Sequence, residues 1–333
     1  MLQLEIPDII GYLERRGRIP VGPGSVVTAC SGGVSGHTFL VDSGGARVVV
    51  KQALERLRTD APWISDPRRA LVEARGLEVF GVVVGPDSSP RVLDVDDERC
   101  VVTMTGAPAE SRSWKELLLN GQVEPAVARA LGAMLGRWHG ASGAAYREEF
   151  GSLTWFRELR VEPFHLAVAG ALPRLATRIQ ALVDDLGRAR TALVHGDFSP
   201  KNILVFGDGR SWVIDFEVCH WGDPTFDLAF MLHHLIMKAI HRPGSGADLF
   251  QCARSFLEAY LETRSGAGES MPSESRTLDH VGCLLLARVV GTSPATYLTV
   301  DQARQVRDLG EAILQGGPTT LVDVWPGGTM RGR

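Results

Sequence analysis

Lysine is scarce in this chain of 333 residues: only four of its 35 basic residues are lysine. The presence of lysine rather than arginine within an apolar segment therefore needs a specific explanation. The sequence also lacks a G-x-x-x-x-G-K-[ST] loop and a G-x-S-x-G elbow, which excludes P-loop nucleotide hydrolases and serine hydrolases of the α/β type. The formal charge of −4 gives no reason to expect nucleic acid or an anionic membrane as a partner.

Cysteine is equally sparse, with five residues, an odd number, and no C-x-x-C pair. This usage is typical of reduced thiols in the cytoplasm. The N-terminus lacks a basic segment followed by an apolar one, so no secretory signal is expected. Charged residues and histidines interrupt the apolar helices before they reach the length of a membrane span. The sequence therefore predicts a cytoplasmic protein whose partners are small molecules.

Two regions differ in their hydrophobic patterning. Residues 1–17 have helical periodicity, and residues 24–105 then show strand-like runs that are interrupted by one helix beginning near Asp66 and Pro67. The expected strands are 25–30, 38–41, 47–51, 91–95 and 100–104. From residue 111 onward the pattern is mainly helical. The sequence therefore predicts an α+β protein with a small strand-rich lobe, residues 1–105, and a larger helical lobe, residues 106–333.

The most informative motif joins Asp197 and Asn202 in H-G-D-F-S-P-K-N to Asp215 in D-F-E. Phosphoryl transfer needs one group that orients a hydroxyl nucleophile, and oxygen ligands that hold magnesium against the phosphates of the donor. These three side chains offer those groups. The motif thus predicts a phosphoryl-transfer site.

The segment between Asn202 and Asp215 has the pattern of a hairpin, with two short apolar runs around Asp208 and Gly209. If these two residues form a two-residue turn, Asn202 faces Asp215 across the strands, close enough for their oxygens to share Mg²⁺. The alternative is an ordinary surface hairpin with polar ends.

A second group of residues lies in the strand-rich lobe. Gly32 and Gly33 stand between two expected strands, where backbone N–H groups can approach phosphate oxygens, although a simple glycine-rich turn is the alternative. Lys51 ends the apolar run V-V-V, and Glu73 on the following helix is its expected partner, with Glu78 as a competitor. The alternative for Lys51 is a strand-end lysine in solvent.

Together these residues resemble the aminoglycoside phosphotransferase and choline kinase type of small-molecule kinase, which has the bilobal protein-kinase-like fold. H-G-D with Asn202 is similar to the catalytic loop of that family, D-F-E to its metal-binding motif, and G-G-V-S, which ends at Ser35, to its phosphate loop. The resemblance implies that residues 1–105 bind the nucleotide. It also implies that residues 106–333 hold the catalytic loop, the metal site and the acceptor pocket.

The resemblance further implies roles for single residues. Asp197 would be the catalytic base or hydroxyl-orienting group, and Asn202 and Asp215 would be ligands of Mg²⁺. Lys51, held by Glu73, would contact the phosphates of ATP or GTP. Further roles are implied for the segment from Met104 to Gly106, whose backbone would contact the purine, and for Asp227, which would steady the catalytic loop. Supporting or substrate-binding residues would be Glu217, His220, Trp221 and Arg288. For Arg288 a salt bridge inside the helical lobe is the alternative.

Departures from protein kinases point to a small acceptor. Gly196 replaces the arginine of H-R-D, Glu217 replaces the glycine of D-F-G, and no A-P-E segment follows. The expected acceptor is a hydroxyl of an aminoglycoside-like, sugar or nucleoside antibiotic, and the carboxylates of Asp197, Asp215, Glu217 and Asp223 would tolerate a cationic one.

Other functions stay open. A metabolic kinase of the methylthioribose, homoserine or choline type is one alternative, and the run from Lys51 to Leu54 is similar to the methylthioribose branch. S-P-K-N after H-G-D departs from that branch. A catalytically silent, nucleotide-binding regulator is the other alternative. The sequence is compatible with a monomer or a homodimer.

Overall fold

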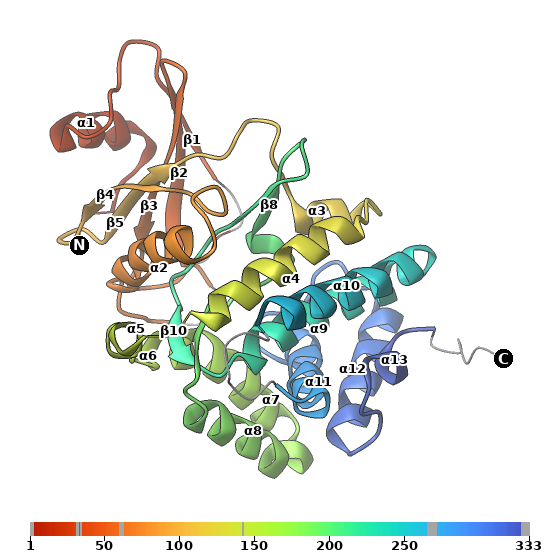
Figure 1. Ribbon diagram of the computed structural model, residues 1–333. Helices are drawn as coiled ribbons and strands as arrows, with labels where there is room; N and C mark the ends of the chain where they lie inside the picture. The colour runs from red at the N-terminus through yellow and green to blue at the C-terminus, as the bar shows by residue number, and fades with distance from the viewer. Residues whose placement is uncertain are drawn as a thin grey trace. The chain divides into compact units, whose positions relative to one another are not determined.

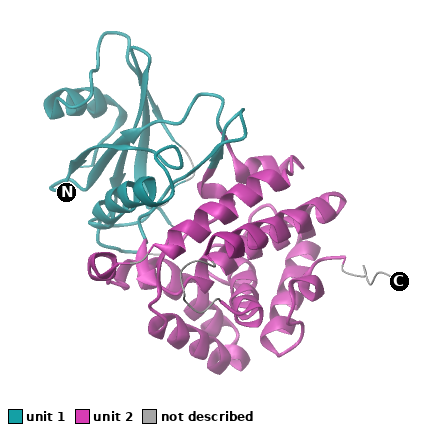
Figure 2. Cartoon of the chain, in the orientation of Figure 1, with its two compact units in different colours: residues 1–111, 204–218 teal, residues 112–203, 219–333 magenta. Residues whose placement is uncertain are grey.

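A computed structural model describes residues 3–30, 33, 35–59, 63–141, 143–264 and 272–327 (Figure 1). The chain forms two compact units, which Figure 2 shows in different colours. Unit 1 comprises Met1–Ser111 and Leu204–Val218, and unit 2 comprises Arg112–Ile203 and Cys219–Arg333. The first unit therefore contains, besides the region before residue 105, a segment that the sequence assigned to the helical lobe.

Unit 1 is built on a five-stranded antiparallel sheet of order β1-β2-β3-β5-β4. The strands are β1 (Val26–Ala29), β2 (Gly36–Ser43), β3 (Ala46–Ala53), β4 (Val92–Asp96) and β5 (Val101–Thr105). Each of the five strands expected from the sequence is present, with its ends shifted by a few residues. The two helices are α1 (Ile6–Arg16) and α2 (Arg69–Val83).

Helix α1 covers one face of this sheet. Its Ile9, Tyr12 and Leu13 are buried in a core cluster with Val48 and Val50 of β3. Because successive residues of a strand point to opposite faces, Lys51 lies on the face that α1 does not cover. The helix ends at Gly17, whose φ of 63° is the left-handed cap that glycine adopts without strain. The alternation along β3 thus places Lys51 on the face of the sheet that meets α2.

Strands β8 (Ile203–Val205) and β9 (Ser211–Val213) form the predicted hairpin, but its turn has three residues. The Phe206 N–H donates to the Arg210 carbonyl at 2.9 Å, and the Gly209 N–H donates to the Phe206 carbonyl at 3.0 Å. Gly209 has a φ of 83°, as the left-handed position of a three-residue loop requires. The predicted register, which paired residue 202 with residue 215, is therefore wrong by one residue.

The hairpin is tied to the rest of unit 1 by two contacts. The Val213 N–H donates to the Ser88 carbonyl at 2.9 Å, and the Phe216 ring packs 5.0 Å from the Phe80 ring of α2. A Cβ at Gly76, also on α2, would lie 2.8 Å from the Cβ of Phe216, so only glycine fits there. These contacts explain why residues 204–218 belong to unit 1, although the sequence placed them in the lobe 106–333.

Unit 2 is mainly helical. Its longer helices are α4 (Pro125–Gly140), α8 (Ala176–Arg188), α9 (Thr225–His241), α10 (Gly246–Arg264), α11 (Glu274–Val290) and α12 (Val300–Leu314). The shorter ones are α3 (Trp114–Leu119), α5 (Ala144–Glu149), α6 (Thr154–Phe156), α7 (Ala167–Ala171) and α13 (Leu321–Val324), with a π-helical segment at Arg157–Leu166. Strand β7 (Ala192–Val194) pairs antiparallel with β10 (His220–Gly222), and β6 (Arg112–Ser113) opens the unit.

All five cysteines are free, as the sequence predicts. Within the described residues, no single helix combines the length and the apolarity of a membrane span; the segments Thr154–Ala171 and Pro173–Arg188 meet that criterion only as a pair bent by 111°.

Helices α4 and α10 run alongside each other in unit 2 (Figure 1) and approach at glycine. A Cβ at Gly132 would lie 2.1 Å from the Phe256 carbonyl oxygen, and one at Gly136 would lie 1.9 Å from Oγ1 of Thr263. Because backbone atoms cannot move aside as a flexible side chain can, the two helices would have to separate. The small residues of α4 therefore set the distance between these helices.

We expect Gly132→Ala to lower the free energy of unfolding by about 1–3 kcal/mol, the usual cost of overpacking. Gly187→Ala in α8 is the matched control, because no heavy atom lies within 4 Å of its added Cβ. That change should raise stability by up to about 1 kcal/mol through helix propensity. Urea unfolding of both variants measures the difference, and equal stabilities would contradict the role of Gly132 in helix packing.

Candidate active site

The catalytic-loop motif lies in unit 2, directly after β7. The backbone N–H groups of His195 and Gly196 donate to the two carboxylate oxygens of Asp227, at 2.7 and 2.8 Å. Gly196 has a φ of 77°, a conformation that strains other residues. The loop therefore needs glycine where protein kinases carry arginine, for a reason of backbone geometry.

Asp227 is fully buried near the start of α9 and receives a third hydrogen bond, from Nε2 of His139 at 3.0 Å. His139 in turn contacts the Tyr260 hydroxyl through Nδ1 at 3.1 Å. Burial acts to raise the pKa of Asp227, but the hydrogen bonds and charges of His139 and His195 together outweigh it and hold the pKa below the ordinary value. The contacts of Asp227 are those of a residue that fixes the catalytic loop.

The Asp197 side chain is almost fully buried and lies between two cations of unit 2. Its Oδ2 is 2.7 Å from the Arg160 guanidinium and 3.0 Å from the Lys201 ammonium. The Asn202 amide donates to the Asp197 backbone carbonyl at 3.0 Å, which directs the amide oxygen of Asn202 away from that carbonyl. Asp197 is thus a carboxylate held in one orientation.

Arg160 is a site residue that the sequence analysis missed. It lies in the π-helical segment Arg157–Leu166, and its Nε also donates to the Gly196 carbonyl at 3.0 Å. Such segments are frequent at functional sites, but no sequence pattern marks them. Lys201 stands four residues after Asp197 in the sequence, and this spacing could have identified it as an ion-pair partner of Asp197.

In unit 1, Lys51 is ion-paired with two carboxylates. Its Nζ lies 2.8 Å from Oε1 of Glu73 on α2 and 2.5 Å from Oδ1 of Asp215. Burial opposes the charged ammonium, but Asp215 and Glu73 outweigh it and raise the pKa of Lys51 above its ordinary value. Lys51 is therefore a fixed positive charge between the sheet and α2, with the partner that the sequence suggested.

Asp215 has a φ of 73°, a left-handed conformation that is rare for residues other than glycine. Such strain persists where the surrounding structure imposes it, and it is concentrated at functional sites. The Asp215 side chain keeps 18% of its surface exposed. The left-handed backbone and the ion pair with Lys51 together fix the direction in which the Asp215 carboxylate points.

Glu217 lies in a buried ion pair rather than at an open surface. Its Oε2 is 3.1 Å from Nε of Arg69, which is fully buried. Arg69 also donates to the carbonyls of Ser35 and Leu54, at 2.5 and 2.7 Å. Glu217 thus anchors an arginine that ties Ser35, at the end of the predicted phosphate loop, to α2.

The residues expected to contact the phosphates and the purine differ in how far their groups are already engaged within unit 1. Gly32 lies outside the described residues, and the Gly33 carbonyl accepts a hydrogen bond from Arg58 at 2.6 Å. Met104 is buried in β5 and lies opposite Val49. The Gly106 N–H donates to the Arg47 carbonyl at 2.8 Å, so this donor is already used within the sheet.

His220 and Trp221 are both buried in β10 of unit 2. The His220 ring stacks on Phe156, with centroids 4.1 Å apart, and the Trp221 indole donates to the Arg190 carbonyl at 2.7 Å. Arg288 on α11 is half-buried, and one of its terminal nitrogens donates to the Ser293 hydroxyl at 3.0 Å. Of these three side chains, Arg288 is the least buried.

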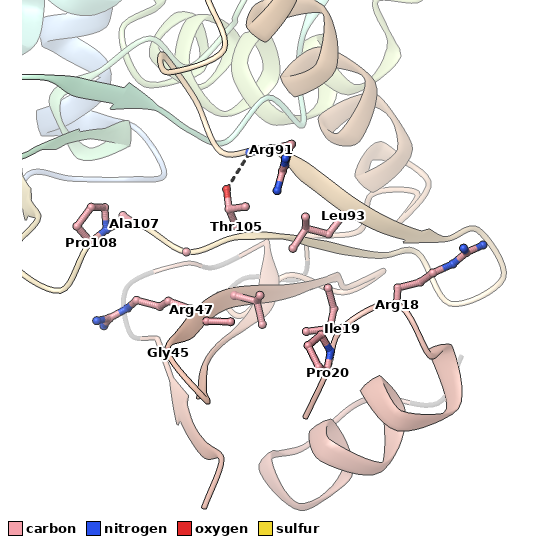
Figure 3. A pocket seen from close by; sticks show the side chains of 13 residues that line it. Arg18, Ile19, Pro20, Gly45, Arg47, Arg91, Leu93, Thr105, Ala107 and Pro108 are labelled. Atoms are coloured by element: carbon pink, nitrogen blue, oxygen red, sulfur yellow. Dashed lines mark hydrogen bonds between the residues drawn. The ribbon is translucent and has the colours of Figure 1, made fainter. Parts of the chain in front are cut away.

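A hollow of about 530 Å³ lies in unit 1 (Figure 3). Its lining includes Ile19, Val48 and Leu93, which belong to or pack against the core cluster beneath α1. From the predicted purine-contacting segment, Thr105 and Gly106 line it. The hollow therefore lies on the α1 side of the sheet, whereas Lys51 lies on the side of α2.

Each unit offers an oxygen ligand suited to a hard cation. Unit 2 carries the amide oxygen of Asn202, and unit 1 separately carries the carboxylate of Asp215, and Mg²⁺ takes ligands of both kinds. Over the described ranges, no three histidine, cysteine or acidic side chains lie together as an all-protein metal site. Magnesium sites that also use the phosphates of a substrate need only one or two carboxylates from the protein.

The fold and these residues define a phosphotransferase of the protein-kinase-like class. A sequence model of the phosphotransferase enzyme family matches residues 26–269. The chain therefore belongs to this family, and it is a small-molecule kinase. The suspected family and the predicted fold class are thereby confirmed.

Solved structures agree on the fold. The macrolide 2'-phosphotransferase MphH of Brachybacterium faecium matches with a TM-score of 0.52 at 17% identity, over 93% of this chain and 99% of that one. A choline/ethanolamine kinase family protein of Mesorhizobium loti matches with a TM-score of 0.52 at 17% identity, over 92% and 95%. The amicoumacin kinase hAmiN matches with a TM-score of 0.53 at 16% identity, over 95% and 96%. No curated protein matches the sequence significantly.

Proposed function

We propose that the protein transfers the γ-phosphoryl group of ATP or GTP to a hydroxyl of a small molecule, with Mg²⁺ bound at the donor phosphates. The observation that carries the proposal is the orientation of Asp197, whose buried carboxylate is held by Arg160 and Lys201 on a loop fixed by Asp227. A carboxylate in this position orients the acceptor hydroxyl and accepts its proton.

The donor side of the proposal rests on Lys51. Its ammonium, fixed by Glu73 and Asp215, would contact the donor phosphates. Asn202 and Asp215 would hold Mg²⁺, which neutralises developing negative charge when it is bound. The amicoumacin kinase, which has a similar fold, was solved with AMP-PNP and Ca²⁺, and this supports a nucleotide donor.

The acceptor belongs to one of two classes of hydroxyl compound, since proteins with related folds are named for macrolide and for choline or ethanolamine substrates. An antibiotic and a hydroxylated metabolite are therefore the two candidates.

The test is nucleotide consumption by the full chain with Mg²⁺ across a panel of hydroxyl compounds, with the product identified by mass spectrometry. A phosphorylated acceptor that forms only with nucleotide and enzyme supports the proposal. Turnover without any phosphorylated organic product would contradict it.

A further inference from the structure

Helix α9 carries a buried lysine that meets a backbone carbonyl and an aromatic ring within the described residues. The Lys238 side chain is 1% exposed. Its Nζ reaches the His234 carbonyl at 3.4 Å and lies 5.9 Å from the centre of the Tyr297 ring. An ammonium has three donors, and a contact of 3.4 Å is longer than a normal hydrogen bond. Lys238 is therefore a buried cation whose donors are poorly satisfied by the residues that the structure describes.

Two other donors share this environment. Within the described residues, Nε of Arg288 and the Tyr297 hydroxyl are buried and have no hydrogen-bond partner. Arg288 acts electrostatically on Lys238, and the Lys238 ammonium faces the Tyr297 ring. We call Lys238, Arg288 and Tyr297 the donor cluster. Buried polar groups are normally hydrogen-bonded, so three under-satisfied donors in one place indicate a missing acceptor.

The electrostatic surroundings of the cluster are positive. In the described part of the chain, the charges that act on Lys238 are those of Lys115 and Arg288. Burial, together with these two cations, lowers the pKa of Lys238 to about 7. An anion placed here would favour the charged lysine. A buried charge without a partner is costly, and proteins keep such groups chiefly where they serve function.

The cluster belongs to the catalytic region of unit 2. Arg288 interacts electrostatically with Asp197, and Lys201, which is ion-paired with Asp197, acts on the neighbouring His234. The acidic residues of the unit that were expected to attract a cation are already neutralised. Asp197 is paired with Arg160 and Lys201, and Asp223 is paired with Arg276.

We infer that the donor cluster binds an anionic group of the acceptor, a carboxylate or a phosphate, so that the substrate is an acidic hydroxyl compound rather than an amino sugar. This inference rests on the proposed function. A guanidinium, an ammonium and a phenol together match the oxygen atoms of such an anion, because all three donate hydrogen bonds and two carry positive charge. The cationic acceptor that the sequence suggested is disfavoured by like-charge repulsion.

The test compares matched acceptors that differ in charge: glycerate with glycerol, gluconate with glucose, and kanamycin as the cationic representative. The acidic member of a pair should be the better acceptor. Lys238→Met should raise its KM about 10- to 100-fold, since a hydrogen bond to a charged group is lost, and should leave the KM of the nucleotide unchanged. Arg304→Gln, an exposed pair with Asp301, is the control that should change neither.

Several results would overturn the inference. One is a preference of the enzyme for kanamycin or for the neutral compounds. Another is an effect of Lys238→Met on the KM of the nucleotide alone, which would assign the cluster to the donor phosphates. The melting temperature separates a structural role from a binding role. Removal of a buried, unpaired charge should raise Tm by a few degrees, whereas loss of a structural contact should lower it.

A binding measurement keeps this inference distinct from the proposed function. If no compound of any charge is phosphorylated, the proposed function fails, but titration with inorganic phosphate still tests the cluster. Calorimetry should show saturable binding to the wild-type chain that is weakened about tenfold or more in Arg288→Gln and is retained in Arg304→Gln. Equal binding to wild type and Arg288→Gln, or none to either, would overturn the inference.

Discussion

Replacement of Asp197 by alanine should lower kcat for acceptor phosphorylation by about 10²- to 10⁴-fold, the usual contribution of a positioned general base. The carboxylate is buried on the fixed loop after β7, where Arg160 and Lys201 hold its Oδ2 in one direction. Alanine removes both the proton acceptor and the group that orients the hydroxyl. Because Asp197 does not contact the donor in the proposed arrangement, the KM of the nucleotide should stay near the wild-type value.

Two further variants make the test of Asp197 specific. Asp197→Asn keeps the size of the side chain but accepts a proton poorly, so it should lose almost as much activity as Asp197→Ala. Asp184→Ala removes a carboxylate on α8 that is 48% exposed, and it should retain full turnover. Thermal melting is needed beside the kinetics, because Asp197→Ala leaves the Arg160 guanidinium without its partner. Full acceptor-dependent turnover by a folded Asp197→Ala protein would rule out the proposed role.

Much of the candidate site could be proposed from the sequence because its residues lie in short motifs or at strand ends. Lys51 was identified from its position after an apolar run, and its contact with Glu73 follows from the place of α2 beside the sheet. The register of the hairpin was not predictable in the same way. It depends on whether the turn has two or three residues, and D-G fits both, since Gly209 takes the left-handed position in the longer loop.

Other features depend on tertiary structure alone. The carboxylates of Asp197, Asp215, Glu217 and Asp223 suggested an acidic site when they were counted along the sequence. Within each unit the fold places a cation against every one of them: Arg160 and Lys201, Lys51, Arg69 and Arg276. The net charge near a site depends on such pairings, which sequence spacing does not reveal.

The second large effect should appear on acidification. Among the buried histidines of unit 2 are His139, His165, His233 and His280, each at most 1% exposed. Burial lowers the pKa of each, to about 3 for His165 and for His280. In the unfolded chain a histidine has a pKa near 6.5. Between these values the unfolded chain binds protons that the folded chain does not, so stability falls as the pH falls below about 6.5.

The expected loss is large because several histidines act together. A histidine that stays neutral throughout this window contributes about 1.4 kcal/mol per pH unit, so His165 and His280 together contribute about 3 kcal/mol per pH unit, and His139 and His233 act in the same direction. A domain is typically stable by about 5–15 kcal/mol, so acidification by a few pH units below 6.5 should remove a large share of the stability of unit 2. Urea unfolding followed by circular dichroism at several pH values between 7.5 and 4.5 measures the slope.

A substitution in the pair formed by His165 and His280 tests the assignment of this slope. Nε2 of His165 lies 3.2 Å from Nδ1 of His280, a hydrogen bond that requires one ring to accept and is lost when that ring is protonated. His280→Asn can keep a hydrogen bond to His165 but takes up no proton. It should therefore reduce the change of unfolding free energy with pH by about 1.4 kcal/mol per pH unit, the contribution of one proton, and make the protein less sensitive to acid. A stability that stays constant between pH 7 and 5 would show that these histidines are not buried in the neutral form.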